Sequence, residues 1–405
     1  MFKKIIFSFL FIFVGIISIS SCGKTPPANG LHQEFYESGS LAKETNYKSG
    51  RKHGLSSEYY SNGKVKSESN YVSGKREGLY REYYEDGQLQ REGRYRNDEL
   101  VGPDRSYYAN GQVKAEYIYE DNQIHGPFKE HYENGQLRQT GDYIRGQKQG
   151  LVMRYFQSGK VQSTANFKSG LEDGDRREYY EAGQIKRVEN LLQGQVEGMS
   201  RQYYPSGKLM TLEGFRNGKR QGIFKKYSEQ GTLVFLWNYQ GGKLAGEGRE
   251  YHDNGEWKRI YHHHNDLLHG LVKEFDDNGR LQKQEHYIKG KKGGKVKTFY
   301  ANGQMDTLES YRYNQLHGLS QGFAPNGILV REANFLDGLL DGPVREYYKT
   351  GQLKKETFYK SDKRDGPEKE YYPNGTLQFE RLYENGQLIT SQQYSFNNQV
   401  AISTH

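Results

Sequence analysis

The chain has 405 residues, of which only 34% are hydrophobic, and its mean hydropathy is −1.00. So few apolar residues exclude two or three ordinary globular domains, while 35 Tyr and 19 Phe are too many aromatics for a disordered chain. The formal net charge of +8 comes from interspersed acidic and basic residues, so we expect no nucleic-acid partner. Tyrosine can bury its ring and keep its hydroxyl in water, which predicts a thin structure without a deep core.

Residues 1–21 have the composition of an export signal. Two lysines precede an apolar run and small residues, and Cys22 follows, as in secretory signals. The stretch Ile19-Ser20-Ser21-Cys22 resembles a bacterial lipobox, in which the cysteine carries the lipid, and Cys22 is the sole cysteine of the chain. We expect a signal peptide over 1–21, with a plain signal and an incidental cysteine as the alternative.

The residues after the signal predict how the chain is anchored. We expect a lipidated Cys22 and a tether over 22–33, in which Pro26 and Pro27 occur. In lipoproteins an Asp after the cysteine favours the inner membrane, and here the residue is Gly23. The prediction is therefore an outer-membrane lipoprotein of the cell envelope, facing the periplasm or the cell surface.

A 24-residue repeat occupies residues 34–387. We count positions from the second residue of a recurrent aromatic pair, which is position 0. Position 0 recurs fifteen times without insertion or deletion, at Tyr36, Tyr60, Tyr84, Tyr108, Tyr132, Phe156, Tyr180, Tyr204, Ser228, His252, Asp276, Tyr300, Ala324, Tyr348 and Tyr372. Strict periodicity of this length indicates a repeat architecture.

Glycines mark two turns in each repeat. Position +3 is always Gly, often in a pair such as Asn62-Gly63, which is a strong hairpin signal. Position +18 is Gly in all fourteen available repeats, and position +14 is Gly in ten. The other five repeats have Asp98, Asn122, Asp266, Asn314 and Asp362 at position +14. These residue types tolerate a left-handed backbone, so position +14 is predicted to have φ > 0.

Short strands are predicted between the turns, for example over 55–60 and 65–71. With a two-residue turn at Asn62-Gly63, Tyr60 faces Val65, and strand alternation places Tyr71 on the face of Val65 and Tyr59 on the other face. The fold class is all-β: an elongated, single-layer antiparallel β-meander of fifteen hairpin repeats. Residues 388–405 are expected to form a C-terminal cap or tail, with a last strand over 388–400.

The repeat unit resembles the MORN repeat variant, found in bacterial proteins often described as YwqK-type antitoxins. The segments Tyr60-Ser61-Asn62-Gly63-Lys64-Val65 and Tyr372-Pro373-Asn374-Gly375-Thr376-Leu377 carry the resemblance, which covers residues 35–387. It implies a β-hairpin repeat fold and roles in protein or lipid contact and assembly. It implies no catalytic residues and no cofactor.

A histidine cluster raises the question of a metal site. His262 and His264, with His252, His263 and His269 nearby, could ligate a metal ion. His252 occupies position 0 and His263 position +11, where other repeats have Tyr. The favoured interpretation is therefore that these rings fill the aromatic rows of the repeat, with His262 and His264 kept as weak metal candidates.

Glutamates recur at position +8 in the outer repeats, as in Glu44 and Glu356, and again at position −2, as in Glu58. Paired carboxylates can act as acid and base when a pocket holds them, but a catalytic site is unique and these pairs recur. A charged solvent face that discourages edge association is the favoured interpretation. No catalytic motif is present, so we expect no enzyme.

The middle repeats are more apolar than the ends. They contain a candidate binding or dimerisation patch made of Leu212, Leu233, Phe235, Leu236, Trp237, Trp257 and Ile260. The alternative is that these residues only add packing in the middle of the array.

The expected function is a non-enzymatic envelope lipoprotein whose array binds or scaffolds a protein, an envelope glycan or lipid headgroups. A component of a toxin system, in an immunity or antitoxin-like role, is the alternative, since the segment 275–281 resembles Tyr-Asp repeat shells. A choline-type wall-binding module is disfavoured, because such aromatic cages rely on Trp and this chain has two.

Overall fold

The computed structural model describes residues 29–396 and 400–404, and every regular element in them is a β-strand. The expected signal peptide, Cys22 and the start of the tether lie outside the described residues. Within the described chain there is no helix that is long and apolar enough to cross a membrane. Residues 29–33, expected to end the tether, belong instead to β1 (Asn29–Phe35), because their main chain pairs with β2 (Leu41–Lys48) from Asn29 onward.

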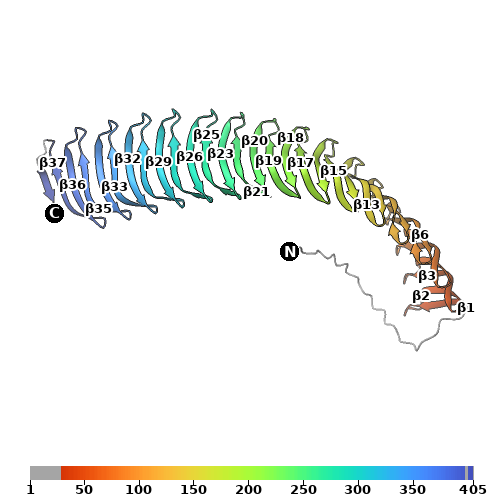
Figure 1. Cartoon of the computed structure of the whole chain (residues 1–405). Coiled ribbons are helices and arrows are strands. Elements are labelled where there is room, and N and C mark those ends of the chain that lie inside the picture. Colours follow the sequence, from red (N-terminus) through yellow and green to blue (C-terminus); the bar gives the residue numbers. More distant parts are fainter. Residues whose placement is uncertain (1–28, 397–399, 405) are drawn as a thin grey trace. The chain divides into compact units, whose positions relative to one another are not determined.

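The chain divides into two units, residues 29–148 with 157–159 and residues 149–156 with 160–404. Within each unit, the strands pair antiparallel in chain order as a meander (Figure 1). Where a strand is interrupted near the position +18 glycine, both of its parts pair with the same preceding strand. The first unit further contains β3 (Arg51–Tyr59), β4 (Val65–Val72), β5 (Lys75–Tyr83), β6 (Leu89–Arg96), β7 (Glu99–Leu100), β8 (Gly102–Tyr107), β9 (Val113–Glu120), β10 (Gln123–Ile124), β11 (Gly126–His131) and β12 (Leu137–Ile144). The strand β13 (Gln147–Tyr155) begins in the first unit and lies mostly in the second.

The second unit holds the remaining strands. They are β14 (Val161–Lys168), β15 (Leu171–Tyr179), β16 (Ile185–Leu192), β17 (Gln195–Tyr203), β18 (Leu209–Arg216), β19 (Lys219–Tyr227), β20 (Leu233–Gln240), β21 (Lys243–Leu244), β22 (Gly246–Tyr251), β23 (Trp257–His264), β24 (Leu267–Leu268), β25 (Gly270–Phe275), β26 (Leu281–Ile288), β27 (Lys291–Lys292), β28 (Gly294–Phe299), β29 (Met305–Arg312), β30 (Gln315–Leu316), β31 (Gly318–Phe323), β32 (Leu329–Leu336), β33 (Leu339–Tyr347), β34 (Leu353–Lys360), β35 (Lys363–Tyr371), β36 (Leu377–Glu384), β37 (Gln387–Tyr394) and β38 (Val400–Thr404). The last strand expected from the sequence is thus a pair, β37 and β38.

The turn at Asn62-Gly63 is one residue longer than predicted. The Gly63 N–H donates to the Tyr60 carbonyl at 2.9 Å, and the Tyr60 N–H donates to the Lys64 carbonyl at 2.8 Å. Gly63 has φ +82°, whereas Asn62 is not among the positive-φ residues. This is a three-residue loop in which a type I turn is followed by a left-handed Gly, and it makes Tyr59, not Tyr60, the partner of Val65.

The Asn in this turn acts through both ends of its amide. The Asn62 Oδ1 accepts a hydrogen bond from the Lys64 N–H at 3.0 Å, and its Nδ2 donates to the Glu85 carbonyl in the next repeat at 3.1 Å. Asn110, Asn134, Asn254 and Asn302 donate to the next repeat in the same way. The residue therefore closes its own turn and joins two repeats.

The second turn confirms the φ > 0 prediction at position +14. All fifteen residues there have positive φ, including Asp98 at 73° and Asn122 at 65°. Position +13 is also left-handed, as in Ser49 at 51°. Two consecutive residues with positive φ, closed by the Lys48–Arg51 pair, make a two-residue type I′ hairpin turn.

The Gly at position +18 marks an irregularity in the pairing. In β3 the register passes from Tyr47↔Lys52 to Thr45↔Ser56, so three residues around Gly54 lie opposite one residue of β2. Gly54 has φ +88°, a conformation that glycine adopts without strain. The invariant glycine is thus a bulge residue.

Each repeat presents two faces, which we name from their residues. The packed face carries positions −4, +9 and +11, as in Ser56, Thr45 and Tyr47. The ladder face carries positions −3, −1 and +8, as in Ser57, Tyr59 and Glu44. Opposed pairs share a face, and the side chains agree: Thr45 hydrogen-bonds Ser56 at 2.7 Å, and the Tyr59 hydroxyl donates to Glu44 at 2.6 Å.

The predicted face of Tyr71 is wrong. A bulge between Glu58 and Tyr59 interrupts strict alternation, so Val65 lies opposite Tyr59 while Tyr71 lies on the packed face. In the next repeat Tyr95, at the same position, meets Tyr80 with ring centroids 4.9 Å apart. A bulge adds one residue to one strand, and parity counted across it is inverted.

Apart from Ser57 on the ladder face, the most buried side chains lie along the centre of the packed face. Phe128, Val152, Val272, Val296 and Glu368, all at position −4, are 1–2% exposed. A large residue at −4 is opposed by a small one at +9, as in Tyr80↔Gly93, and the order reverses in Gly248↔Tyr261. A single sheet has no second layer to pack against, so the pairing of large with small residues provides its close packing.

Candidate binding surfaces

The ladder face carries a row of alternating positions −3 and +8, which we call the charge row. In the outer repeats it alternates base and acid across neighbouring strands. The ion pairs are Arg81–Glu92 at 3.6 Å, Arg105–Glu116 at 3.0 Å, Arg345–Glu356 at 2.7 Å and Lys369–Glu380 at 3.3 Å. Each cation therefore has an anion on an adjacent strand.

Tyrosines at position −1 complete this arrangement. The hydroxyl of Tyr83 donates to Glu68 at 3.1 Å and that of Tyr107 to Glu92 at 2.9 Å, and Tyr347 contacts Glu332 in the same way. The bond to Glu44 raises the pKa of Tyr59, because ionisation of the phenol would place two anions side by side. In the outer repeats the acids are thus paired with bases and accept hydrogen bonds from phenols.

The charge row changes between β15 and β31. Position −3 stays basic there, with Arg177, Arg201, Lys225, Arg249, Lys273 and Lys297. Position +8 becomes apolar or neutral, with Val188, Leu212, Leu236, Ile260, Gln284 and Leu308. The pairing register joins these residues in one continuous row. We call this stretch the cationic segment.

Most cations of the segment lack an anion. Arg249 pairs with Glu247 at 2.6 Å and Arg177 approaches Asp175 at 3.6 Å. Within residues 29–396, no ion pair or side-chain hydrogen bond is formed by the four others: Arg201, Lys225, Lys273 and Lys297. Arg201 is exposed and the three lysines are half-buried, so their charges are open to a partner from outside the array.

An aromatic and apolar row runs beside the cationic segment. At position −1 it has Tyr203, Tyr227 and Tyr251, which are opposed across the strands by Leu209, Leu233 and Trp257. Because Val188 and Leu212 replace Glu, the Tyr203 and Tyr227 hydroxyls have no hydrogen-bond partner in the described chain. Trp257 is 45% exposed. The rings therefore form a row that runs parallel to the row of cations on the same face.

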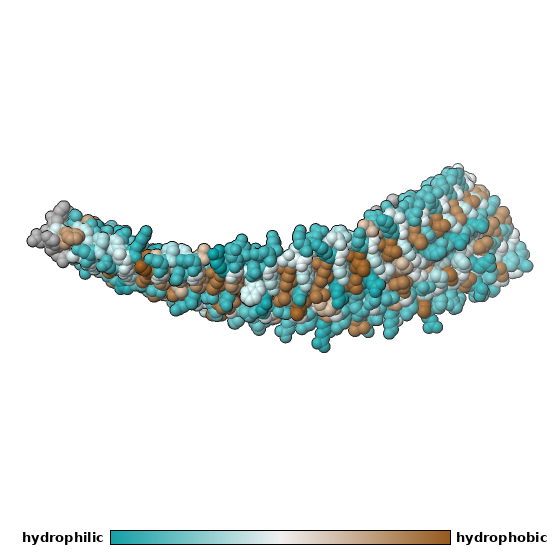
Figure 2. All heavy atoms as spheres, turned by 90° about the horizontal axis from the view of Figure 1, so that it is seen from above, coloured by the Kyte–Doolittle hydropathy of each residue, from teal (hydrophilic) through white to brown (hydrophobic). Residues whose placement is uncertain are grey.

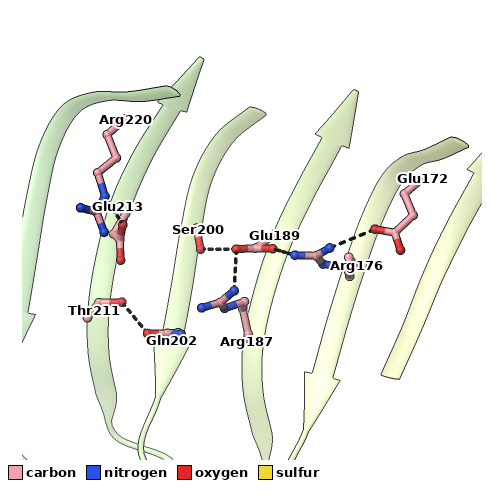
Figure 3. A network of polar contacts seen from close by, with 9 residues as sticks. All are labelled: Glu172, Arg176, Arg187, Glu189, Ser200, Gln202, Thr211, Glu213 and Arg220. Carbon is pink, nitrogen blue, oxygen red and sulfur yellow. Dashed lines mark hydrogen bonds and ion pairs between the residues drawn. The ribbon is translucent and has the colours of Figure 1, made fainter. Parts of the chain in front are cut away.

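The packed face of the same repeats satisfies its own charges. Glu189, 5% exposed, accepts from Ser200 at 2.8 Å, lies 3.6 Å from Arg187 and hydrogen-bonds Arg176 (Figure 3). Arg176 also reaches Glu172 at 3.0 Å. Farther along β18 and β19, Glu213 and Arg220 form a separate pair at 2.9 Å (Figure 3). This network is internally compensated, unlike the cationic segment.

An aromatic cluster on the packed face is also self-contained. Trp237 stacks on Phe224 with centroids 5.1 Å apart and contacts Phe235 at 4.9 Å, and its indole N–H donates to the Tyr261 hydroxyl. Burial raises the pKa of Tyr261. A hollow of about 230 Å³ beside Tyr261 is lined partly by Leu244 and Leu268. The cluster stabilises the middle repeats by packing.

The predicted patch is divided between the two faces. Phe235 and Trp237 belong to the packed face. Leu212, Leu236 and Ile260 lie in the charge row, and Leu233 and Trp257 lie in the aromatic row. Alternation within β20 separates Leu236 from its neighbours on either side. On the face seen in Figure 2, apolar residues lie in bands separated by hydrophilic ones.

The sequence did not single out the basic residues at position −3. They occur in eleven of the fifteen repeats, both inside and outside the cationic segment, so their presence alone carries no signal. The feature that marks the cationic segment is the loss of the acid at position +8. Its importance becomes clear only from the strand register, which places Leu212 between Arg201 and Lys225.

The histidines are dispersed by strand alternation. His262 lies 3.7 Å from Glu247, and the rings of His264 and His269 are 6.2 Å apart. His263 points to the packed face, where its ring meets Tyr261 at 5.1 Å and burial lowers its pKa. No group of three or more potential ligands is found within the described residues. His252 replaces Tyr at position 0 and contacts the Phe275 carbonyl at 3.0 Å.

These features define the class of protein: an antiparallel β-hairpin repeat array with a specialised middle on its ladder face. Thirteen segments match the MORN repeat variant, at residues 28–49, 52–73, 76–97, 100–121, 124–145, 148–169, 172–191, 196–217, 268–289, 292–313, 316–337, 340–361 and 364–385. They cover more than half of the chain, which therefore belongs to the MORN repeat variant family. Residues 218–267 lie between two matched segments and include Trp237 and Trp257.

Other comparisons add little. The chain matches no curated protein. The crystal structure of TcdB2-TccC3-Cdc42 shares 12% identity over 93% of this chain, with a TM-score of 0.16, and the structure of a Photorhabdus luminescens Tc holotoxin pore with mutated TccC3 gives the same values. This chain spans about a quarter of the length of those chains (24%). A TM-score so low carries no argument about fold or function.

Proposed function

We propose that this chain is a non-enzymatic cell-envelope lipoprotein, anchored in the outer membrane through Cys22, whose array binds a partner along the ladder face between β15 and β31. The observation that carries the proposal is the cationic segment, where the bases of the charge row remain and their acids are lost. Unpaired charges beside exposed rings are suited to electrostatic recognition of a partner.

The repeated arrangement of residues in the cationic segment favours a binding function over a catalytic one. The arrangement of base, uncharged residue and ring recurs from Arg177 to Leu308, whereas an active site requires one unique constellation. A repeated surface instead contacts a partner at many equivalent points, as repeat proteins do with their extended faces.

Site-directed photo-crosslinking in cells tests the binding proposal. A photo-reactive residue replaces Ile223, which is 47% exposed on the ladder face, or Lys226, which is exposed on the packed face of the same strand, β19. We expect an adduct with an envelope component from position 223 and none from position 226. No adduct from either position, or equal adducts from both, would contradict the proposal.

Fractionation tests the anchor separately. The wild-type full chain is expected in the outer-membrane fraction, and Cys22→Ser in the soluble envelope fraction, because the thiol is the only site for lipid attachment. If Cys22→Ser stays with the membrane, anchoring through Cys22 is wrong.

A further inference from the structure

The cationic segment is periodic. Its bases recur on every second strand, and two strand spacings are about 9.6 Å, with the apolar side chains Leu212, Leu236 and Ile260 between them. The row runs across the strands over the twelve residues from Arg177 to Leu308. A partner that pairs with every base must therefore be long, linear and negatively charged at the same spacing.

The aromatic row narrows the chemistry of the partner. Tyr203 and Tyr227 lie two residues beyond Arg201 and Lys225 in the same strands, so ring and cation project from the same face. Their hydroxyls are free within the described chain. Rings of this kind offer rigid area with a hydrogen-bonding edge, which suits a polymer that has both C–H surface and hydroxyl groups.

We propose that the ladder face between β15 and β31 binds a linear acidic polysaccharide, laid across the strands with its carboxylates on the unpaired bases. A pyranose unit is about as long as one strand spacing, roughly 4.8 Å. In a chain of acidic sugars, the carboxylate of every second sugar therefore matches the period of the bases. This inference rests on the proposed function and specifies its partner.

Other polyanions fit the same surface less well. An extended acidic peptide binds to sheets most readily by adding a strand at an edge, which would run along the strands and not across them. A lipid surface is contacted by projecting apolar side chains, whereas Leu212, Leu236 and Ile260 are half-buried between longer basic ones. These partners are therefore outcomes of the test and not the proposal.

Binding of polygalacturonate to the detergent-solubilised full chain is the direct test. We expect saturable binding that weakens as ionic strength rises, and no binding of neutral dextran. The decisive variant is Leu212→Glu with Leu236→Glu and Ile260→Glu, which gives the cationic segment the acids of the outer repeats. Since Arg105–Glu116 forms in that same pattern, the fold is expected to persist by circular dichroism, while binding falls at least about tenfold.

A matched variant adds the same charge elsewhere. Gln184, Gln193 and Gln230 are exposed turn residues, and their change to Glu alters the net charge equally without touching the charge row. It is expected to bind polygalacturonate as the wild type does. Equal loss in both variants would reduce the effect to net charge and overturn the proposal.

Competing probes separate the remaining outcomes. The other probes are poly-glutamate, duplex DNA and phosphatidylglycerol vesicles. If one of them binds more tightly than polygalacturonate, and the Glu variant loses that binding, the polysaccharide assignment is overturned. In that case, or if position 223 crosslinks to a protein, the proposed function stands without this inference. No binding of polygalacturonate together with no adduct from position 223 would overturn both.

Discussion

The hydroxyl of Tyr204 donates a hydrogen bond to the main-chain carbonyl of Tyr227, 2.8 Å away and 23 residues along the chain. Tyr204 is at position 0 and Tyr227 at position −1 of the following repeat. The same bond recurs in both units, as in Tyr60 to Tyr83 and Tyr348 to Tyr371. Position 0 is therefore a link between consecutive repeats at the edge where the three-residue turns lie.

Tyr204→Phe removes this link and nothing else. We expect a loss of about 1 kcal/mol in the free energy of unfolding, the net value of one such hydrogen bond. Because a repeat contacts mainly its neighbours, amide exchange should quicken locally, in β17 to β20. Tyr203→Phe is the matched control, since the Tyr203 hydroxyl has no partner in the described chain. Equal effects of the two substitutions would contradict the role of the link.

Asp98 at position +14 combines backbone conformation with a bond between repeats. Its φ is 73°, and its Oδ1 accepts from the Arg76 N–H at 2.7 Å. Asp98→Ala should cost about 1–2 kcal/mol, because a left-handed residue with a Cβ and no polar side chain is strained. Asp98→Gly should cost less, since ten repeats have Gly there. Denaturant melts compare the two, and an Ala variant as stable as the Gly variant would refute the conformational explanation.

Gly93 provides the space that Tyr80 occupies on the packed face. A Cβ at residue 93 would lie 2.7 Å from the Tyr80 ring and 2.6 Å from the Asp104 carboxylate. Gly93→Ala is expected to destabilise the first unit by about 1–3 kcal/mol through overpacking. Tyr80→Ser, which gives the residue type at the equivalent Ser56, is destabilising by itself, but the double variant should lose less stability than the sum of the two single variants. Additive destabilisation in the double variant would show that the two positions are not complementary.

Glu368 makes the second unit sensitive to acid. It is 1% exposed, and although burial by itself raises its pKa, Lys355, Arg381 and Thr357 together hold the pKa below the ordinary 4.5. The unfolded chain therefore takes up this proton more readily than the folded one. The stabilisation is complete above about pH 4.5 and is lost as the pH falls through the lowered pKa of the folded state.

Glu368→Gln should remove that pH dependence. At neutral pH it is expected to cost roughly 1.5–3 kcal/mol, the value of hydrogen bonds to a charged group. Its melting temperature should then change less than that of the wild type between pH 6 and pH 3, measured by circular dichroism. Glu380→Gln, in the half-exposed pair with Lys369, is the control and should change stability by under about 1 kcal/mol. Parallel pH profiles for Glu368→Gln and wild type would contradict the assignment.

The repeat pattern predicted most of the architecture. Strict spacing identified the hairpins, and the exchange of Gly with Asp98 and Asn122 identified a left-handed turn position from the sequence alone. Two predictions were wrong: Tyr60 does not face Val65, because the turn is one residue longer, and Tyr71 does not share the face of Val65, because a bulge lies between them. Hydropathy alternation alone cannot locate an extra residue in one strand, because a bulge changes the hydrogen-bond register and leaves the composition unchanged.

The sequence by itself determined the repeat, its two turns and the more apolar middle, because local backbone preferences recur in every copy. Only the tertiary structure decided what that middle consists of. Trp237 and Leu236 are adjacent in the chain, yet one packs against Phe224 and the other separates Lys225 from Arg249. Which charges lack a partner depends on pairing between strands, and that register is set by turns and bulges acting together across neighbouring repeats.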